Sequence, residues 1–101
     1  MIGEKDIETL FGKQLARIGD KELRGKVVKT FVLACRRGNW GSVDGLKKLP
    51  FTLLTDALGV SFVEHTIAVT EGAAALGRAQ AEAYGRLPYA VDFDRLYAGG
   101  L

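Results

Sequence analysis

The sequence contains few cysteine and histidine residues, the side chains that form disulfides and bind transition metals. It has one cysteine and one histidine among 101 residues, together with two prolines and one methionine. A single cysteine cannot form a disulfide within the chain. Cys35 falls at an apolar position of a predicted helix, so we interpret it as a small buried side chain in a reducing compartment. A nucleophilic role would need a nearby base, which sequence alone cannot establish.

The sequence also lacks a long apolar run and a strong excess of one charge. No apolar stretch approaches the roughly 18 residues of a membrane span, and the start lacks the charged-then-apolar pattern of a signal peptide. Fourteen Lys and Arg residues are balanced by twelve Asp and Glu residues, which gives a net charge of +2 with both signs interspersed. We therefore expect a cytoplasmic protein with no membrane partner and no nucleic-acid partner.

Two basic pairs, Arg36–Arg37 and Lys47–Lys48, are the largest clusters of positive charge. Each falls at the predicted end of a helix, where the helix dipole favours cations, so we interpret both as solvated helix ends. The alternative is nucleic-acid binding through these four residues and Trp40, which would require all five on one surface. We expect Trp40 instead to fold back on the core from its loop.

The first half of the sequence predicts a helical hairpin. The composition, 48% hydrophobic and 26% charged, is that of one folded globular domain. Apolar residues at steps of three and four predict one helix over residues 6–18 and another that begins after an Asp20 cap and ends near Gly38. A turn this short favours antiparallel packing. The predicted apolar faces are Ile7, Leu10, Phe11, Leu15 and Ile18, then Leu23, Val27, Phe31, Ala34 and Cys35.

Residues 39–60 predict a turn, a short helix and a connecting segment. Ser42 is positioned to cap a helix through Leu46, which ends before Pro50. The following stretch, residues 49–60, is apolar without a long period, so we expect a buried connecting segment with at most one helical turn.

The last 41 residues predict two further helices. Ser61 and Glu64 have the spacing of a capping box, which predicts a long helix that Gly85 ends. Asp92 is positioned to cap a final helix over residues 93–101, and the fold class is therefore all-α. This helix reaches Leu101 without a polar tail, which we interpret as an interruption of a longer chain. Its predicted apolar side consists of Phe93, Leu96, Tyr97 and Gly100.

His65 is the one residue that could carry metal chemistry. It lies in the first turn of the long predicted helix and shares a helical face with Val69, Gly72 and Leu76. This spacing predicts that the imidazole points toward the core. Taken alone, such a residue is a structural histidine with one satisfied hydrogen bond.

The residues around His65 resemble a known family. The string from Leu53 to Glu71, LLTDALGVSFVEHTIAVTE, resembles the opening of the HD-domain core, in which a helix begins Val-Glu-His-Thr and the histidine is the first metal ligand. Residues 92–101 are similar to the family's next helix, which leads into Leu-His-Asp-Val-Gly-Lys. The resemblance implies that residues 1–49 are an N-terminal helical extension and that residues 50–101 begin a truncated HD-like core.

The family consists of metal-dependent phosphohydrolases, and only part of its site is matched here. Members bind one or two divalent metals, such as Mn, Fe, Zn or Mg, through a first His, a His-Asp pair and a distant Asp. A water bound to such a metal becomes a hydroxide nucleophile. Only His65 matches a ligand position. The resemblance thus implies the N-terminal fragment of a hydrolase of phosphate esters or nucleotides, inactive as this chain and possessing no catalytic residue of its own.

We also expect the chain to form homo-oligomers. The resemblance implies that helices beyond Leu101 would cover apolar faces, and exposed apolar faces favour association or helix exchange. The alternative function is a small all-helical homo-oligomeric interaction protein without catalysis, in which His65 is a core residue and the apolar C-terminal end is the dimer interface.

Overall fold

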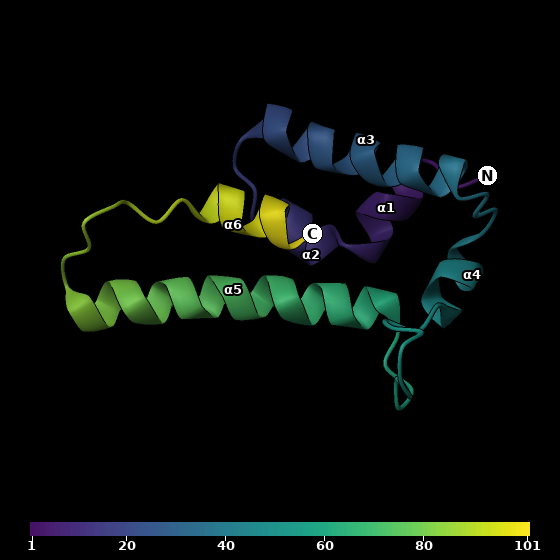
Figure 1. The fold of residues 1–101 in the computed structure, drawn as a ribbon. Helices are drawn as coiled ribbons and strands as arrows, with labels where there is room; N and C mark the ends of the chain where they lie inside the picture. The colour runs from purple at the N-terminus through teal and green to yellow at the C-terminus, as the bar shows by residue number, and fades with distance from the viewer.

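The protein is all-α, as predicted. The computed structural model describes all 101 residues, and Figure 1 shows helices joined by loops with no sheet. One isolated antiparallel bridge joins Pro50 and Ser61. The helices are α1 (Glu4–Leu10), α2 (Gly12–Ala16), α3 (Lys21–Arg37), α4 (Val43–Lys48), α5 (Phe62–Tyr84) and α6 (Phe93–Gly100).

Side-chain caps begin the last four helices, at the residues that the sequence predicts. The Ser61 hydroxyl accepts a hydrogen bond from the Glu64 amide at 3.1 Å, and the Glu64 carboxylate accepts one from the Ser61 amide at 3.2 Å. These bonds satisfy amides that have no partner within the first turn. Gly85 ends α5 with a φ of 64°, a left-handed conformation that glycine adopts without strain. The other three caps are Asp20, Ser42 and Asp92.

The prediction of one continuous helix over residues 6–18 is wrong. The chain forms α1 and α2, separated at Phe11, which has a φ of −118° and a ψ of 26°. Gly12 follows directly, and glycine weakens a helix because it loses the most backbone freedom on folding. The predicted face is nevertheless correct, because four of its five members are buried and Leu10 is half-buried. The buried members are Ile7, Phe11, Leu15 and Ile18.

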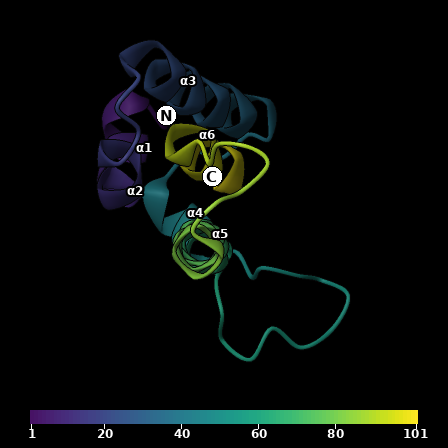
Figure 2. The same cartoon turned by 90° about the vertical axis from the view of Figure 1, so that its left-hand side faces the viewer.

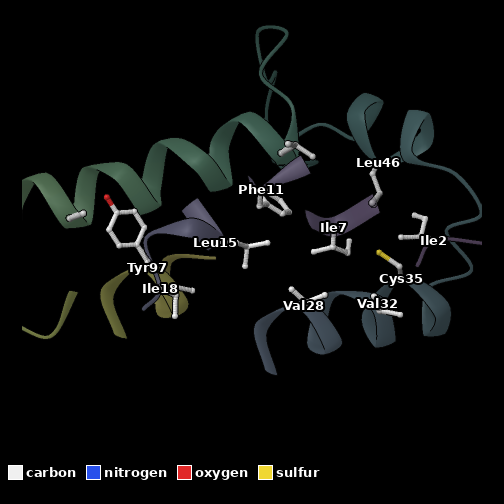
Figure 3. Close-up of a cluster of buried hydrophobic side chains, with 12 residues drawn as sticks. Ile2, Ile7, Phe11, Leu15, Ile18, Val28, Val32, Cys35, Leu46 and Tyr97 are labelled. Carbon is white, nitrogen blue, oxygen red and sulfur yellow. The ribbon is translucent and has the colours of Figure 1, made fainter. Parts of the chain in front are cut away.

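The core surrounds α1 and α2, with α3 on one side and residues of α4, α5 and α6 on the other (Figure 3). The chain direction of α3 is opposite to that of α1 and α2, as the hairpin prediction requires (Figure 1). The buried face of α3 consists of Val28, Val32 and Cys35, so only Cys35 of its predicted face is fully buried. Burial raises the pKa of the Cys35 thiol. Trp40 packs against this core, which confirms the prediction for its loop.

Helices α5 and α6 pack closely because glycine and threonine lie at their crossing. A Cβ placed on Gly100 would stand 2.7 Å from both the Cα and the Oγ1 of Thr70. Gly77 of α5 similarly lies against Leu96 of α6. Tyr97 is buried, and Phe93, Leu96 and Gly100 are half-buried, which confirms the predicted apolar side of α6.

Asp94 joins α6 to the turn before α3. Its carboxylate accepts hydrogen bonds from the amides of Gly19 at 3.0 Å and Asp20 at 2.9 Å. The Gly19 bond, followed by the Asp20 bond, lowers the pKa of Asp94 because both stabilise the ionised form. This contact connects two segments that lie 74 and 75 residues apart in the chain.

The prediction of a buried segment over residues 49–60 is wrong. Residues 51–60 form a loop that projects away from the helices (Figure 2). Its base is closed by backbone hydrogen bonds from Phe51 to the Val60 carbonyl and from Phe62 to the Leu49 carbonyl, at 3.2 and 2.7 Å. No helix packs over the loop, so its apolar composition does not lead to burial.

Candidate association surface

His65 does not point toward the core, which corrects the sequence prediction. The residue is exposed in the first turn of α5, and its ring stacks on Phe51 with centroids 4.8 Å apart. The other residues on its predicted face, Val69, Gly72 and Leu76, are also exposed. The buried face of α5 instead consists of Val63, Thr66, Thr70, Ala74 and Gly77.

The two carboxylates of α5 nearest to His65 in the sequence, Glu64 and Glu71, have structural partners and do not join it. Glu64 completes the capping box at the start of the helix. Glu71 accepts hydrogen bonds from the amide nitrogen of Gln14 at 3.0 Å and from the Tyr97 hydroxyl at 3.4 Å. Figure 3 shows the Tyr97 hydroxyl directed at α5. These bonds satisfy polar groups at the junction of α2, α5 and α6.

The residues present do not fit a divalent metal within one copy of the chain. No group of three or more His, Cys, Asp or Glu side chains lies close enough to hold an ion. Metal affinity depends on several converging ligands and on the second shell that orients them. His65 is exposed and so accessible to a ligand, but its own chain provides no cluster of three such donors around it.

The basic pairs lie where the sequence places them. Arg36 and Arg37 are exposed in the last turn of α3, and Lys47 and Lys48 are exposed in the last turn of α4.

None of the helices is both long and apolar enough to cross a lipid bilayer.

An apolar groove runs between α3 and α6. Its volume is about 480 Å³, which lies within the range of roughly 300–1,000 Å³ typical of ligand pockets. Four of its residues, Leu23, Val27, Phe31 and Ala34, are those predicted to form the buried face of α3. They form a second apolar stripe, which α6 covers only in part. The remaining lining residues are Lys26, Thr30, Ala98, Gly99 and Leu101.

The projecting loop carries the most exposed leucines of the molecule. Leu53, Leu54 and Leu58 are 87%, 97% and 84% exposed. The tip is held by two local hydrogen bonds, from the Leu54 amide to the Thr52 hydroxyl and from the Leu58 amide to the Asp56 carboxylate. Single exposed leucines are common on proteins, but three on one short loop form an apolar patch of the kind that marks contact sites.

The molecule exposes more surface than a compact monomer of its size. Its accessible surface is 7013 Å², whereas a folded monomer of 10.9 kDa has about 5,600 Å². Its radius of gyration is 15.2 Å, compared with about 13 Å for a compact domain of this length. The shortest dimension is 19 Å, or about two helix diameters. A core this thin buries only 16 of 101 residues.

The comparisons with known proteins add no assignment. The chain matches no family model, no curated protein and no solved structure. The HD-domain resemblance, the phosphohydrolase function and the role of His65 as a metal ligand therefore stay predictions.

Sequence reasoning missed the loop leucines and the groove as surface features. The sequence predicts both as core, because apolar residues at helical spacing or in a continuous run usually indicate burial. One signal was available in the loop, where Thr52, Thr55, Asp56 and Gly59 interrupt the apolar residues with turn-forming types. No comparable signal marks the groove, since its residues alternate with the buried ones along the same helix.

Proposed function

We propose that this protein is a small helical interaction module that associates with further copies of itself. The observation that carries the proposal is the excess of surface, about 1,400 Å² above that of a compact monomer of this mass. A specific interface buries about 800 Å² on each partner. The excess area is therefore larger than the area that one such interface buries on each partner. The loop and the groove contribute apolar residues to the exposed surface.

The proposal is tested by measuring the mass of the wild-type chain in solution. Light scattering coupled to size-exclusion chromatography, repeated over a range of micromolar concentrations, should give a mass above 10.9 kDa that rises with concentration. Native mass spectrometry of the same samples gives the number of copies. A strictly monomeric species throughout this range would contradict the proposed function.

A second candidate function follows from the position of His65. Its imidazole is exposed at the start of α5, so it is open to a metal whose other ligands come from outside this copy of the chain. We propose on this basis that His65 is the first ligand of an HD-type phosphohydrolase site that these 101 residues do not complete.

The metal proposal is tested by native mass spectrometry after exposure to Mn, Fe, Zn or Mg. Because one copy does not complete the site, a bound metal should appear only on wild-type assemblies of two or more copies, and it should be lost in His65→Ala. The matched control is Phe51→Ala, which removes the aromatic ring stacked on His65 but keeps the imidazole. Metal bound equally by wild type and His65→Ala, or by neither, would contradict the role of His65.

A further inference from the structure

We propose that two copies associate by exchanging loops: residues 51–60 of each copy insert into the α3/α6 groove of the other. This inference rests on the proposed function and deepens it by naming the contact. The loop presents leucines with no partner in their own chain, and the groove presents apolar side chains that α6 leaves uncovered. Burial of both surfaces is the main favourable term in such an association.

The loop is suited to insertion because hydrogen bonds within it favour one shape before contact. Backbone hydrogen bonds close its base, and the Thr52 and Asp56 side chains hold its tip. An ordered loop loses less conformational freedom when it binds than a disordered one, so more of the burial energy appears as affinity. Leu53 and Leu54 at the tip are the residues expected to enter deepest.

The charges of the two surfaces are complementary. Asp56 is the one charged residue of the loop, and Lys26 is the one charged residue that lines the groove. Lys26 has an ion pair with Glu22 at 3.5 Å, but both side chains are largely exposed, so this pair contributes little and can be replaced. Complementary charges fix the orientation of partners more than they add affinity.

The buried area favours reciprocal insertion over insertion in one direction. A leucine buries about 100 Å² of apolar surface, so three loop leucines contribute about 300 Å². The exposed apolar lining of the groove is smaller than the area of these leucines, so one insertion stays well below the roughly 1,200 Å² at which specific interfaces begin. Two insertions in a two-fold dimer double the buried area. A two-fold arrangement also closes the assembly, whereas one-way insertion would propagate into a chain of molecules.

Two variants separate the loop from the groove. The loop variant is Leu53→Ser with Leu54→Ser, and its matched control is Leu76→Ser, an exposed leucine of α5. The groove variant is Ala34→Glu, which places a charged side chain among the apolar residues of the groove. Its control is Leu33→Glu, an exposed neighbour in α3 that does not line the groove. Circular dichroism verifies that each variant keeps the wild-type helix content.

Self-association constants of all five proteins decide the proposal. The loop and groove variants should each dimerise at least about 100-fold more weakly than wild type, while the controls stay within a few-fold of it. A mixture of the loop and groove variants retains one intact contact of two, so it should form a mixed dimer of intermediate strength. Wild type mixed with the combined loop-and-groove variant should form no mixed dimer.

Four outcomes would overturn the inference. A groove variant that dimerises like wild type would indicate contact between loops, and a mixture without a mixed dimer would exclude loop exchange. Dimerisation at wild-type strength in both the loop and the groove variant would exclude the loop contact but agree with the proposed self-association. A monomeric wild type would overturn both, so the failure of each proposal is separately visible.

Discussion

Replacement of Gly100 by alanine is expected to destabilise the protein through the α5/α6 crossing. The added Cβ would lie 2.7 Å from the Cα of Thr70 and 3.0 Å from its Cβ. The Cα belongs to the backbone of α5 and cannot rotate away, so α6 must shift or unwind at its end. Tyr97 is buried on the same side of α6, and a shift would loosen its packing as well.

The expected loss of unfolding free energy is about 1–2 kcal/mol. Overpacking of a tight contact costs about 1–3 kcal/mol. Alanine recovers up to about 1 kcal/mol of helix propensity in a helix interior, and less at position 100 because it is the last residue of α6. The matched control is Gly25→Ala in α3, where a new Cβ meets nothing within 4 Å. That variant should gain about 0.5–1 kcal/mol.

Urea unfolding followed by far-UV circular dichroism measures both changes. All samples should have the same low protein concentration, because association makes apparent stability depend on concentration. A thermal scan should show the Gly100→Ala midpoint about 4–16 °C below wild type, which is the shift expected for this loss in a domain of this size. A Gly100→Ala variant that is as stable as Gly25→Ala would refute the close packing of α6 on α5.

Three further predictions concern single side chains. Asp94→Ala should lower the free energy of unfolding at neutral pH, because the Gly19 and Asp20 amides depress the pKa of Asp94 in the folded protein. The contribution of Asp94 to stability is present above about pH 4 and is lost as the pH falls through the folded pKa. Acid titrations of wild type and variant should therefore converge at low pH. Ser61→Ala should lower the free energy of unfolding by about 1 kcal/mol through loss of the α5 cap, while Ser61→Asp should retain most of the capping energy. Equal losses for the two variants would argue against the cap. Cys35 should react slowly with a thiol reagent at neutral pH and quickly in urea, because it is buried and its pKa is raised; fast labelling of the folded protein would exclude its burial.

The helix starts were predictable because capping is local. Each of Asp20, Ser42, Ser61 and Asp92 accepts its hydrogen bond from an amide two or three residues further along, so the sequence alone specifies the partner. The break at Phe11 is local too, and Gly12 was its available signal.

The orientation of α5 was not predictable from spacing alone. The helix has two stripes of small and apolar residues, one through His65, Val69 and Leu76 and one through Thr66, Thr70 and Ala74. Hydrophobicity favours the first stripe, but the second is buried because its small residues allow Gly100 to approach the backbone. That choice depends on a residue 30 positions away from Thr70, so periodicity within α5 cannot reveal it.

The α3/α6 groove depends on the same kind of distant contact. Leu23, Val27 and Phe31 share one face of α3, and Val28, Val32 and Cys35 share the next face. Both faces are apolar, so the sequence identifies a helix with a wide apolar surface. Which part of that surface stays uncovered is decided by where Asp94 and the α5 crossing hold α6.

The closed base of the projecting loop makes the loop separable from the fold. The backbone bond from Phe62 to the Leu49 carbonyl and the bridge between Pro50 and Ser61 join α4 to α5 without help from the loop tip. Residues 52–59 could therefore be shortened, lengthened or exchanged for another turn while the helices keep their places. The contact that the loop makes can then be changed by substitution with little effect on the helical scaffold that carries it.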